Sequence, residues 1–311
     1  MQKRLIALFL VLCLTCASCV GVPPTDGTEA PITFVDDLGR AVSLSETPKR
    51  TACLLGSFAD VWQLSGGTVV ASASDAWESL SLELSDAVNL GGAHSPSLEL
   101  LLSSEPDFVL ASASTASHLA MRETLESMRI PVAYFDVDNF EDYLSMLDIC
   151  TTLTGHKELY LENGLVLKDG IERIKDEYCK QGFTYQREFL LLRTSSTGVK
   201  VKGSEGTILG EMLSDIGAVN IASKTPSLLE SLSLEAIAKE DPYHIFVVTM
   251  GSNTELALEV FDRLTQENPL WASLSAVKAG RVHIMDKNLF NLKPNARYLE
   301  AYETLYQALL S

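Results

Sequence analysis

The body of the chain alternates short apolar runs with amphipathic stretches of about ten residues. In the first half, apolar runs at 50–55, 69–73, 108–111 and 131–135 predict buried strands, and helical patterns lie between them. Strands that alternate with helices in this way form βαβ units around a mainly parallel sheet. The first half therefore predicts an α/β lobe, which a small hairpin at 32–44 precedes.

Between residues 140 and 179 the pattern changes to a long helical stretch. Apolar residues such as Leu161 and Ile171 recur there at approximately helical spacing, and the stretch is broken only near Gly155. After residue 181 the alternation of strands and helices resumes. The chain is therefore predicted to have an α/β fold, with two α/β lobes of mainly parallel sheets joined by a long interdomain helix.

These changes of pattern divide the chain into five segments. The segments are a lipoprotein signal peptide at 1–18, a flexible tether at 19–31, an N-terminal α/β lobe at 32–153, a connecting helix at 154–181 and a C-terminal α/β lobe at 182–311. The tether is rich in Pro, Gly, Thr and acidic residues, which is typical of a flexible linker.

The N-terminus has the order of an export signal. Lys3 and Arg4 form a basic head, an apolar run continues to Leu14, and small residues precede Cys19. The run is too short to cross a hydrocarbon core about 30 Å thick. The small residues before Cys19 resemble the bacterial lipobox, in which the cysteine is lipidated and becomes the new N-terminus. Cys16 is the alternative lipidation site, and a plain secretory signal is the alternative to lipidation.

The chain is acidic, with 24 Lys and Arg against 41 Asp and Glu, and a formal net charge of −17. Removal of the signal peptide takes away two basic residues and gives 22 − 41 = −19. Such a surface repels phosphate, so we expect no nucleic-acid partner and membrane contact through the N-terminal lipid only. Three further cysteines have no ligand spacing and are expected to be free thiols: Cys53, Cys150 and Cys179.

Motifs of catalysis are absent from the sequence, which has no nucleophile elbow, phosphate-binding loop or zinc-protease motif. Its five histidines are scattered without ligand spacing. We therefore expect no enzyme activity, no cofactor and no metal site. Two other classes stay open: an anchored extracellular α/β enzyme, which needs a buried nucleophile and base, and an adhesion module, which needs an exposed apolar face.

The two halves of the chain share a repeated pattern. In each half, Ser-Leu-Glu begins a short apolar helix that is followed by an acidic turn with Pro and a buried strand. The two copies are Ser97-Leu98-Glu99 and Ser233-Leu234-Glu235. Ser is a good helix N-cap, and one such unit in each half suggests duplicated lobes.

Three stretches resemble the substrate-binding lipoproteins of ABC importers, in the branch that serves iron-siderophores, haem and cobalamin. Residues 267–283 read ENPLWASLSAVKAGRVH and resemble the C-terminal signature of this family. Residues 90–110 resemble its first-lobe motif, and residues 32–54 resemble its entry segment. The resemblance implies a ligand held in a cleft between the two lobes, with little closure because a helix stiffens the hinge.

The resemblance also implies the function. We expect a monomeric, lipid-anchored receptor on the extracytoplasmic face of the cell membrane, which captures an iron-siderophore or related chelate and delivers it to an ABC permease. Haem and cobalamin are the alternative ligands. In this family one Glu on each lobe meets Arg residues of the permease, and the matching positions are Glu99 and Glu235. The alternative is that both carboxylates only favour the helix dipole.

Ligand contacts in such folds come from the carboxyl ends of strands and the loops that follow them. Arg193 would pair with an anionic ligand, Trp77 and Phe290 would give flat apolar contacts, and Met250 is placed to serve as an axial ligand of haem. The candidate ligand-binding residues are Ser57, Phe58, Trp62, Trp77, Ser112, Ser114, Arg193, Thr194, Met250, Gly251, Phe290 and Asn291.

Overall fold

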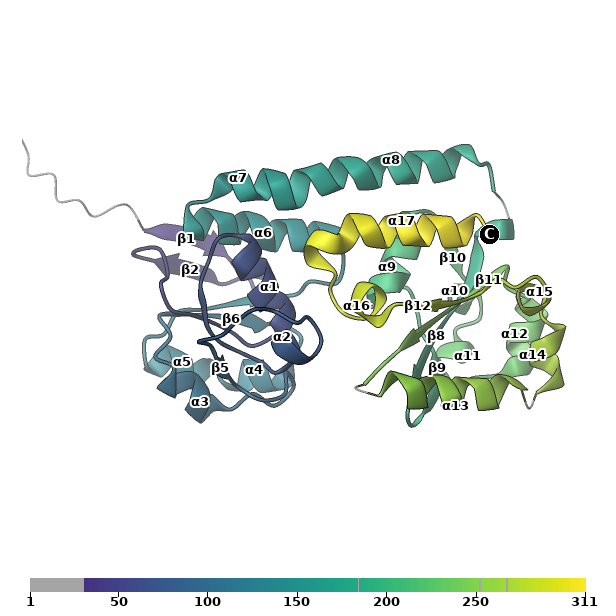
Figure 1. The fold of residues 1–311 in the computed structure, drawn as a ribbon, viewed down its shortest axis with the longest axis horizontal. Helices are drawn as coiled ribbons and strands as arrows, with labels where there is room; N and C mark the ends of the chain where they lie inside the picture. Colours follow the sequence, from purple (N-terminus) through teal and green to yellow (C-terminus); the bar gives the residue numbers. More distant parts are fainter. Residues whose placement is uncertain (1–30, 184, 252, 267) are drawn as a thin grey trace, which may run out of the picture.

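A computed structural model describes residues 31–183, 185–251, 253–266 and 268–311. Figure 1 shows two α/β lobes beside each other beneath a layer of long helices. Each lobe is built on its own five-stranded sheet, and most strand pairs in both sheets are parallel. The predicted α/β fold of two lobes and a long joining helix is therefore confirmed.

The predicted signal peptide, Cys19 and the tether as far as residue 30 lie outside the described residues. Within the described part of the chain, no helix combines the length and the apolar character that crossing a membrane requires. The division of the chain into five segments stays a prediction.

The N-terminal lobe is a parallel sheet packed between helices. Its strands are β3 (Thr51–Cys53), β4 (Val69–Ser72), β5 (Val88–Asn89), β6 (Phe108–Ser112) and β7 (Val132–Phe135), after an antiparallel hairpin of β1 (Ile32–Val35) and β2 (Ala41–Leu44). Its helices are α1 (Gly56–Leu64), α2 (Asp75–Glu78), α3 (Leu98–Ser103), α4 (Ala116–Ala120) and α5 (Arg122–Ser127). The strand order is β5-β4-β3-β6-β7. β3 and β6 are buried along their whole length, as expected for strands that are covered on both faces.

The C-terminal lobe repeats this plan with one antiparallel edge strand. Its strands are β8 (Glu188–Ser195), β9 (Gly198–Val201), β10 (Val219–Asn220), β11 (His244–Thr249) and β12 (Val282–Met285). The path β10-β8-β11-β12 is parallel, and β9 pairs antiparallel with β8. Its helices and helical turns are η2 (Tyr185–Arg187), α9 (Ile208–Asp215), α10 (Ile221–Lys224), α11 (Ser227–Glu230), α12 (Leu234–Glu240), α13 (Thr254–Gln266), α14 (Pro269–Ser273), α15 (Ser275–Lys278) and α16 (Lys287–Phe290).

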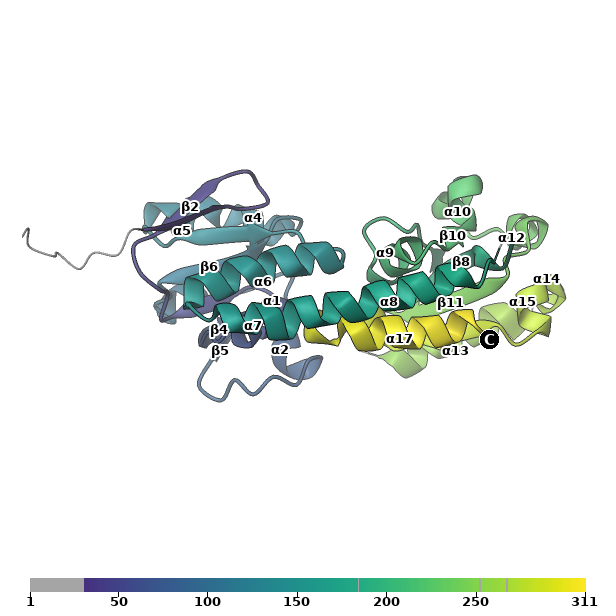
Figure 2. The same cartoon turned by 90° about the horizontal axis from the view of Figure 1, so that it is seen from above.

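A layer of helices joins the lobes on one side (Figures 1 and 2). The layer consists of α6 (Phe140–Thr154), α7 (Lys157–Tyr160), the π-helical turn η1 (Leu161–Leu165), α8 (Val166–Lys180) and α17 (Tyr298–Leu309). Gly155 ends α6 with a left-handed φ of 78°, a conformation that glycine adopts without steric cost. The chain then reverses, and a continuous helical stretch from α7 to α8 extends over both lobes with α17 beside it (Figure 2).

One hydrophobic cluster continues through this layer from lobe to lobe. It includes Phe58 in the N-terminal lobe, Tyr143 and Ile171 in the helical layer, and Phe246 in the C-terminal lobe. Tyr298, at the start of α17, packs its ring 5.6 Å from the ring of Tyr143, measured between centroids. Two smaller clusters lie on the opposite faces of the two sheets. The lobes therefore share packed side chains as well as connecting chain.

Asn295 fixes the segment by which the chain returns from the C-terminal lobe to α17. It begins the 3₁₀ turn η3 (Asn295–Arg297), is 1% exposed and has a left-handed φ of 50°. Its amide Nδ2 donates to the Ser57 carbonyl oxygen at 2.9 Å and to Asp60 Oδ2 at 2.8 Å, and both acceptors belong to α1. Asn tolerates this φ better than most residues do, so one side chain serves both the turn and the contact between lobes.

We predict that Asn295→Ala lowers the free energy of unfolding by about 2–4 kcal/mol. The variant loses two hydrogen bonds, leaves the half-buried Asp60 carboxylate without its amide donor, and places a Cβ-bearing residue without a polar side chain at a positive φ. Asn295→Gly removes the same hydrogen bonds but accepts the backbone conformation, so it should cost less than Asn295→Ala. Urea unfolding followed by circular dichroism measures both, and equal, near-zero losses would contradict the assigned role.

Candidate functional site

Two adjoining pockets lie between the lobes. The first, of about 540 Å³, is lined by Glu78 and Ser79 of the N-terminal lobe and by residues at the ends of β11 and β12. The second, of about 330 Å³, is lined by Asp60 and the loop after α2, and by the segment that leads to α17. Both pockets include Ser79 and Asn288. A ligand in this cleft would therefore touch both lobes at once.

The three predicted serines of the N-terminal lobe follow its central strands. Ser57 lies in the first turn of α1 after β3, Ser112 ends β6, and Ser114 is exposed in the next loop. The hydroxyl oxygens of Ser112 and Ser114 are hydrogen-bonded at 3.2 Å. Ser57 and Ser112 are buried, so Ser114 offers the most accessible hydroxyl of the three.

His118 holds the loop beside these serines. Its Nδ1 accepts a hydrogen bond from the Ser112 backbone N–H at 3.1 Å, and its Nε2 lies 2.8 Å from the Ala93 carbonyl oxygen. Because the backbone N–H can only donate, Nδ1 carries no proton and Nε2–H donates to Ala93. The ring is fully buried, and this burial lowers the pKa of His118 below its usual value. Sequence reasoning missed His118, since its partners are backbone atoms that no spacing reveals.

On the facing lobe, Arg193 and Thr194 lie inside a strand, whereas the sequence predicted a loop there. β8 extends to Ser195 because it pairs with β9, which the apolar pattern did not predict. The two side chains point to opposite faces of the sheet. Thr194 is buried and donates to the Ala257 carbonyl oxygen at 2.6 Å, so it fixes α13. Arg193 is half-buried, and its Nε has no hydrogen-bond partner.

Met250 and Gly251 follow β11 at the edge of the first pocket. The Met250 side chain is 47% exposed, which leaves its thioether accessible. The Gly251 carbonyl oxygen accepts a hydrogen bond from Lys287 Nζ at 3.0 Å, and Lys287 lines that pocket. Trp77 and Asn291 are half-buried, and Trp77 packs partly against the shared core.

Three predicted aromatic contacts lie in the hydrophobic core instead of the cleft. Phe58 and Phe290 are 1% exposed, and Trp62 is fully buried with its indole N–H donating to the Thr68 carbonyl oxygen. A position after a strand does not decide which way a helical side chain faces, and α1 and α16 bury these rings. We therefore leave the three out of the candidate site.

Two charged residues of the second pocket were missing from the sequence candidates. Asp60 accepts from Asn295, and burial raises the pKa of its carboxyl group. Lys293 donates to the Val137 carbonyl oxygen, and burial lowers the pKa of its ammonium group. They come from opposite halves of the chain, so only the folded structure brings them to one pocket. Among the described residues, no group of three or more His, Cys, Asp or Glu side chains is arranged to hold a metal ion.

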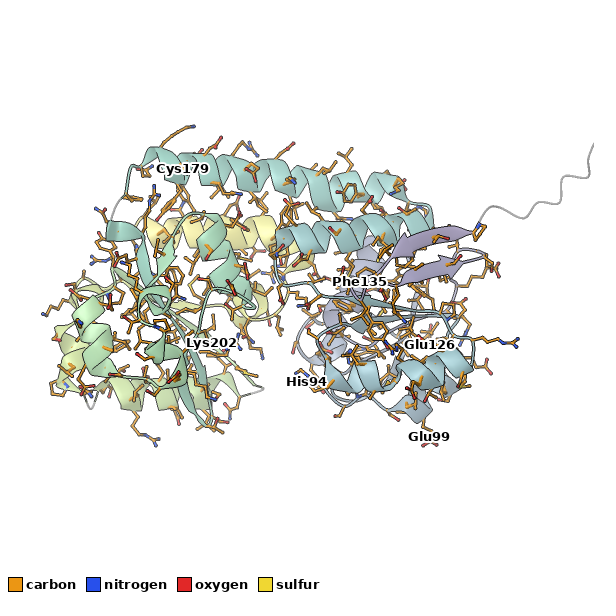
Figure 3. The ribbon with its side chains drawn as sticks, turned by 180° about the vertical axis from the view of Figure 1, so that it is seen from behind. His94, Glu99, Glu126, Phe135, Cys179 and Lys202 are labelled. Carbon is orange, nitrogen blue, oxygen red and sulfur yellow. The ribbon has the colours of Figure 1, made fainter. Side chains whose placement is uncertain are left out.

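The two Glu positions occupy equivalent places in the two lobes. Glu99 and Glu235 are exposed in the first turns of α3 and α12. Ser97 and Ser233 cap these helices, each accepting a backbone hydrogen bond from the residue three positions later. Figure 3 shows Glu99 at the end of its lobe that is remote from the helical layer.

Two α/β lobes on a shared helical layer, with pockets between them, define a bilobal binding-protein fold. A family model described as periplasmic binding protein matches residues 52–289, which is most of the chain. The chain belongs to this family.

Two of the relatives match nearly end to end. The "Putative ABC transporter substrate-binding lipoprotein YhfQ" of Bacillus subtilis is 25% identical over 312 residues, which cover 94% of this chain and 93% of the relative. The Fe(3+)-citrate-binding protein YfmC of the same organism is 26% identical and covers 92% of this chain and 91% of the relative.

Solved structures share the fold. Staphylococcus aureus SirA, complexed with staphyloferrin B, matches with a TM-score of 0.71 at 20% identity, covering 90% of this chain and 98% of its own. S. aureus IsdE, complexed with heme, matches with a TM-score of 0.67 at 15% identity, covering 84% and 99% respectively. At these identities the likeness concerns the fold alone.

We predict that the His118 ring stays in the neutral Nε2–H form and remains more than half neutral at pH 6.5, where an unperturbed imidazole is half protonated. Its burial disfavours the charge, and protonation of Nδ1 would break the bond from the Ser112 N–H. Nitrogen-15 NMR of the imidazoles, assigned by loss of the signal in His118→Gln, measures both properties. A Nδ1–H tautomer, or a ring that is mostly protonated at pH 6.5, would refute the assignment.

Proposed function

We propose that this chain is the extracytoplasmic, lipid-anchored substrate-binding component of an ABC importer. It captures an iron-siderophore or related chelate and delivers it to the membrane permease. The observation that carries the proposal is the pair of pockets whose walls come from both lobes. Family membership supports it, as do relatives named for ABC transport and for ferric citrate binding.

The proposed work of the protein is reversible capture without bond making. A cleft between preformed lobes suits a small ligand, because few groups need ordering when the ligand enters. Polar groups on both walls, such as Ser79 and Lys287, would orient the ligand, and the apolar surface of Trp77, next to Glu78 in α2, would cover it. The ligand brings its own metal, and the chain acts as a monomer held at the membrane by lipid on Cys19.

Haem binding is the second candidate function. It is favoured by the exposed Met250 side chain at the end of β11, because a thioether can serve as an axial ligand of haem iron.

Docking to the permease is assigned to Glu99 and Glu235. Each is exposed, each begins a helix in its own lobe, and neither lines the interlobe pockets. Charges placed in this way would steer docking and set its register without touching the ligand.

Purified mature protein should bind at least one iron chelate with a Kd of about 1 µM or tighter. Ferric siderophores, ferric citrate, haemin and cobalamin are titrated while tryptophan fluorescence is recorded, and the bound compound is recovered by gel filtration. Mass spectrometry should find the recovered ligand unchanged. Absence of binding to every compound would contradict the proposal, and recovery of a cleaved ligand would favour the enzyme alternative.

Reversing both docking charges, Glu99→Lys with Glu235→Lys, should abolish uptake and change the chelate Kd by less than about twofold. The two side chains lie outside the pockets, so ligand binding has no reason to change. Glu123→Lys with Glu259→Lys makes the same charge change at exposed positions, one in each lobe, and should leave uptake intact. Normal uptake by the first variant, or lost ligand binding, would refute the docking role.

A further inference from the structure

Three basic side chains share one face of the hairpin formed by β8 and β9. Arg193 is directly opposite Lys200 in the antiparallel register, so both point to the same face. The backbone N–H of Lys202 donates to the Leu191 carbonyl oxygen at 2.9 Å, which places Lys202 two residues further along this face. We call Arg193, Lys200 and Lys202 the hairpin cluster.

The carboxylates of the described residues do not neutralise the hairpin cluster. None of its members makes an ion pair with them, and the Arg193 Nε is buried without a hydrogen-bond partner. Burial lowers the pKa of Arg193. Burial also lowers the pKa of Lys202, and the like charges of Arg193 and Lys200 lower it further. Like charges are thus held together in a partly buried place, which costs free energy unless an anion joins them.

Among the described residues, the hairpin cluster makes no ion pair although the chain is rich in carboxylates. Acidic residues outnumber basic ones by 41 to 24, so a basic residue has carboxylates available to it. Lys175, for example, contacts Glu172 at 3.1 Å and Asp215 at 2.8 Å. Lys287 and Lys293 donate to backbone carbonyl oxygens at the edge of the cleft. The hairpin cluster has no such partner among the described residues, so its charges are available to an anion from outside the chain.

Lys202 of the hairpin cluster faces the other lobe. Figure 3 shows it on the edge of the C-terminal lobe, with His94 on the facing edge of the N-terminal lobe. His94 is exposed, and its loop is held by the hydrogen bond from His118 to Ala93. The exposed hydroxyl group of Ser114 follows β6 in the same lobe. Both edges therefore offer hydrogen-bond donors to an anion between them.

We propose that the hairpin cluster binds the carboxylate groups of the cargo, which makes the cargo an anionic, carboxylate-bearing iron chelate and not a neutral one. The inference rests on the proposed function and narrows its substrate class. Arg193 supplies a planar fork that can hold one carboxylate with two hydrogen bonds, and Lys202 adds a second charge beside it. Two chemical sources carry such groups, a ferric hydroxycarboxylate and the propionates of haem.

The test compares ferric citrate, haemin and a neutral ferric trihydroxamate on one protein. We expect the better of the two carboxylate-bearing chelates to bind at least about tenfold more tightly than the trihydroxamate. Arg193→Gln should weaken that binding at least about tenfold and Lys202→Gln about threefold or more, while Arg193→Lys keeps the charge and should retain more affinity than Arg193→Gln. The chelate whose Kd rises in Arg193→Gln identifies the source of the carboxylates: a ferric hydroxycarboxylate if it is ferric citrate, and the haem propionates if it is haemin.

Lys278→Gln is the matched control. It removes one positive charge from an exposed position on α15, away from the hairpin, and should change each Kd by less than about twofold. Thermal unfolding of every variant confirms that it is folded, and Lys202→Gln tests the cluster if Arg193→Gln is unstable. Two outcomes would overturn the inference and leave the proposed function standing. One is equal or tighter binding of the neutral chelate, and the other is unchanged affinity in folded Arg193 and Lys202 variants. Failure of all three chelates to bind would contradict the proposed function and the inference together.

Discussion

The packing of both lobes against one helical layer is the constraint on which the rest of the structure depends. Tyr143 and Tyr298 meet within that layer, and the cluster that contains them reaches Phe58 in one lobe and Phe246 in the other. Interiors packed in this way do not deform continuously, so the lobes cannot swing apart without exposing apolar surface. Asn295 adds a polar link between the returning chain and α1. The packing of both lobes on one layer therefore opposes a large change in the cleft between them.

Stiff walls would favour affinity under the proposed function. Little free energy would go into ordering the walls, so more of the interaction with a ligand would be retained as affinity. The distribution of charged residues in this chain also favours the binding of an anion. Acidic residues outnumber basic ones by 41 to 24, and among the described residues eight Lys and Arg side chains form ion pairs with them, whereas Arg193 and Lys202 form none. A cation that is held apart from the abundant carboxylates of its own chain is available to an anion from outside.

The architecture could be read from the sequence because it depends on local patterns. The alternation of apolar runs predicted both sheets, and the helical stretch from 140 to 179 predicted the joining layer, including its break at Gly155. The Ser97 and Ser233 caps also followed from short-range chemistry. The site was harder to predict, because its residues meet only through long-range contacts. Asp60 and Lys293 are far apart in sequence and share one pocket.

The direction of a side chain was the second obstacle. Trp62 and Phe290 follow strands of the two lobes, as cleft residues do, yet their helices turn both rings into the core. Arg193 and Thr194 are neighbours in β8 with opposite roles, because successive residues of a strand face opposite sides. If the sequence had predicted that β8 continues to Ser195, the alternation of strand side chains would have assigned Arg193 and Thr194 to opposite faces. That continuation depends on pairing with β9, which the apolar pattern did not predict.

Under the proposed function, a permease has to distinguish loaded from empty protein. The helical layer shared by both lobes limits how it can do so. Glu99 and Glu235 are carried on α3 and α12, whose lobes share one core, so their separation would change little when a ligand binds. Any difference between the two states that the permease detects then has to come from the cleft itself. An anion that neutralises Arg193 and Lys202 removes a repulsion that the empty protein carries, and this gives the loaded state an electrostatic difference without a large movement.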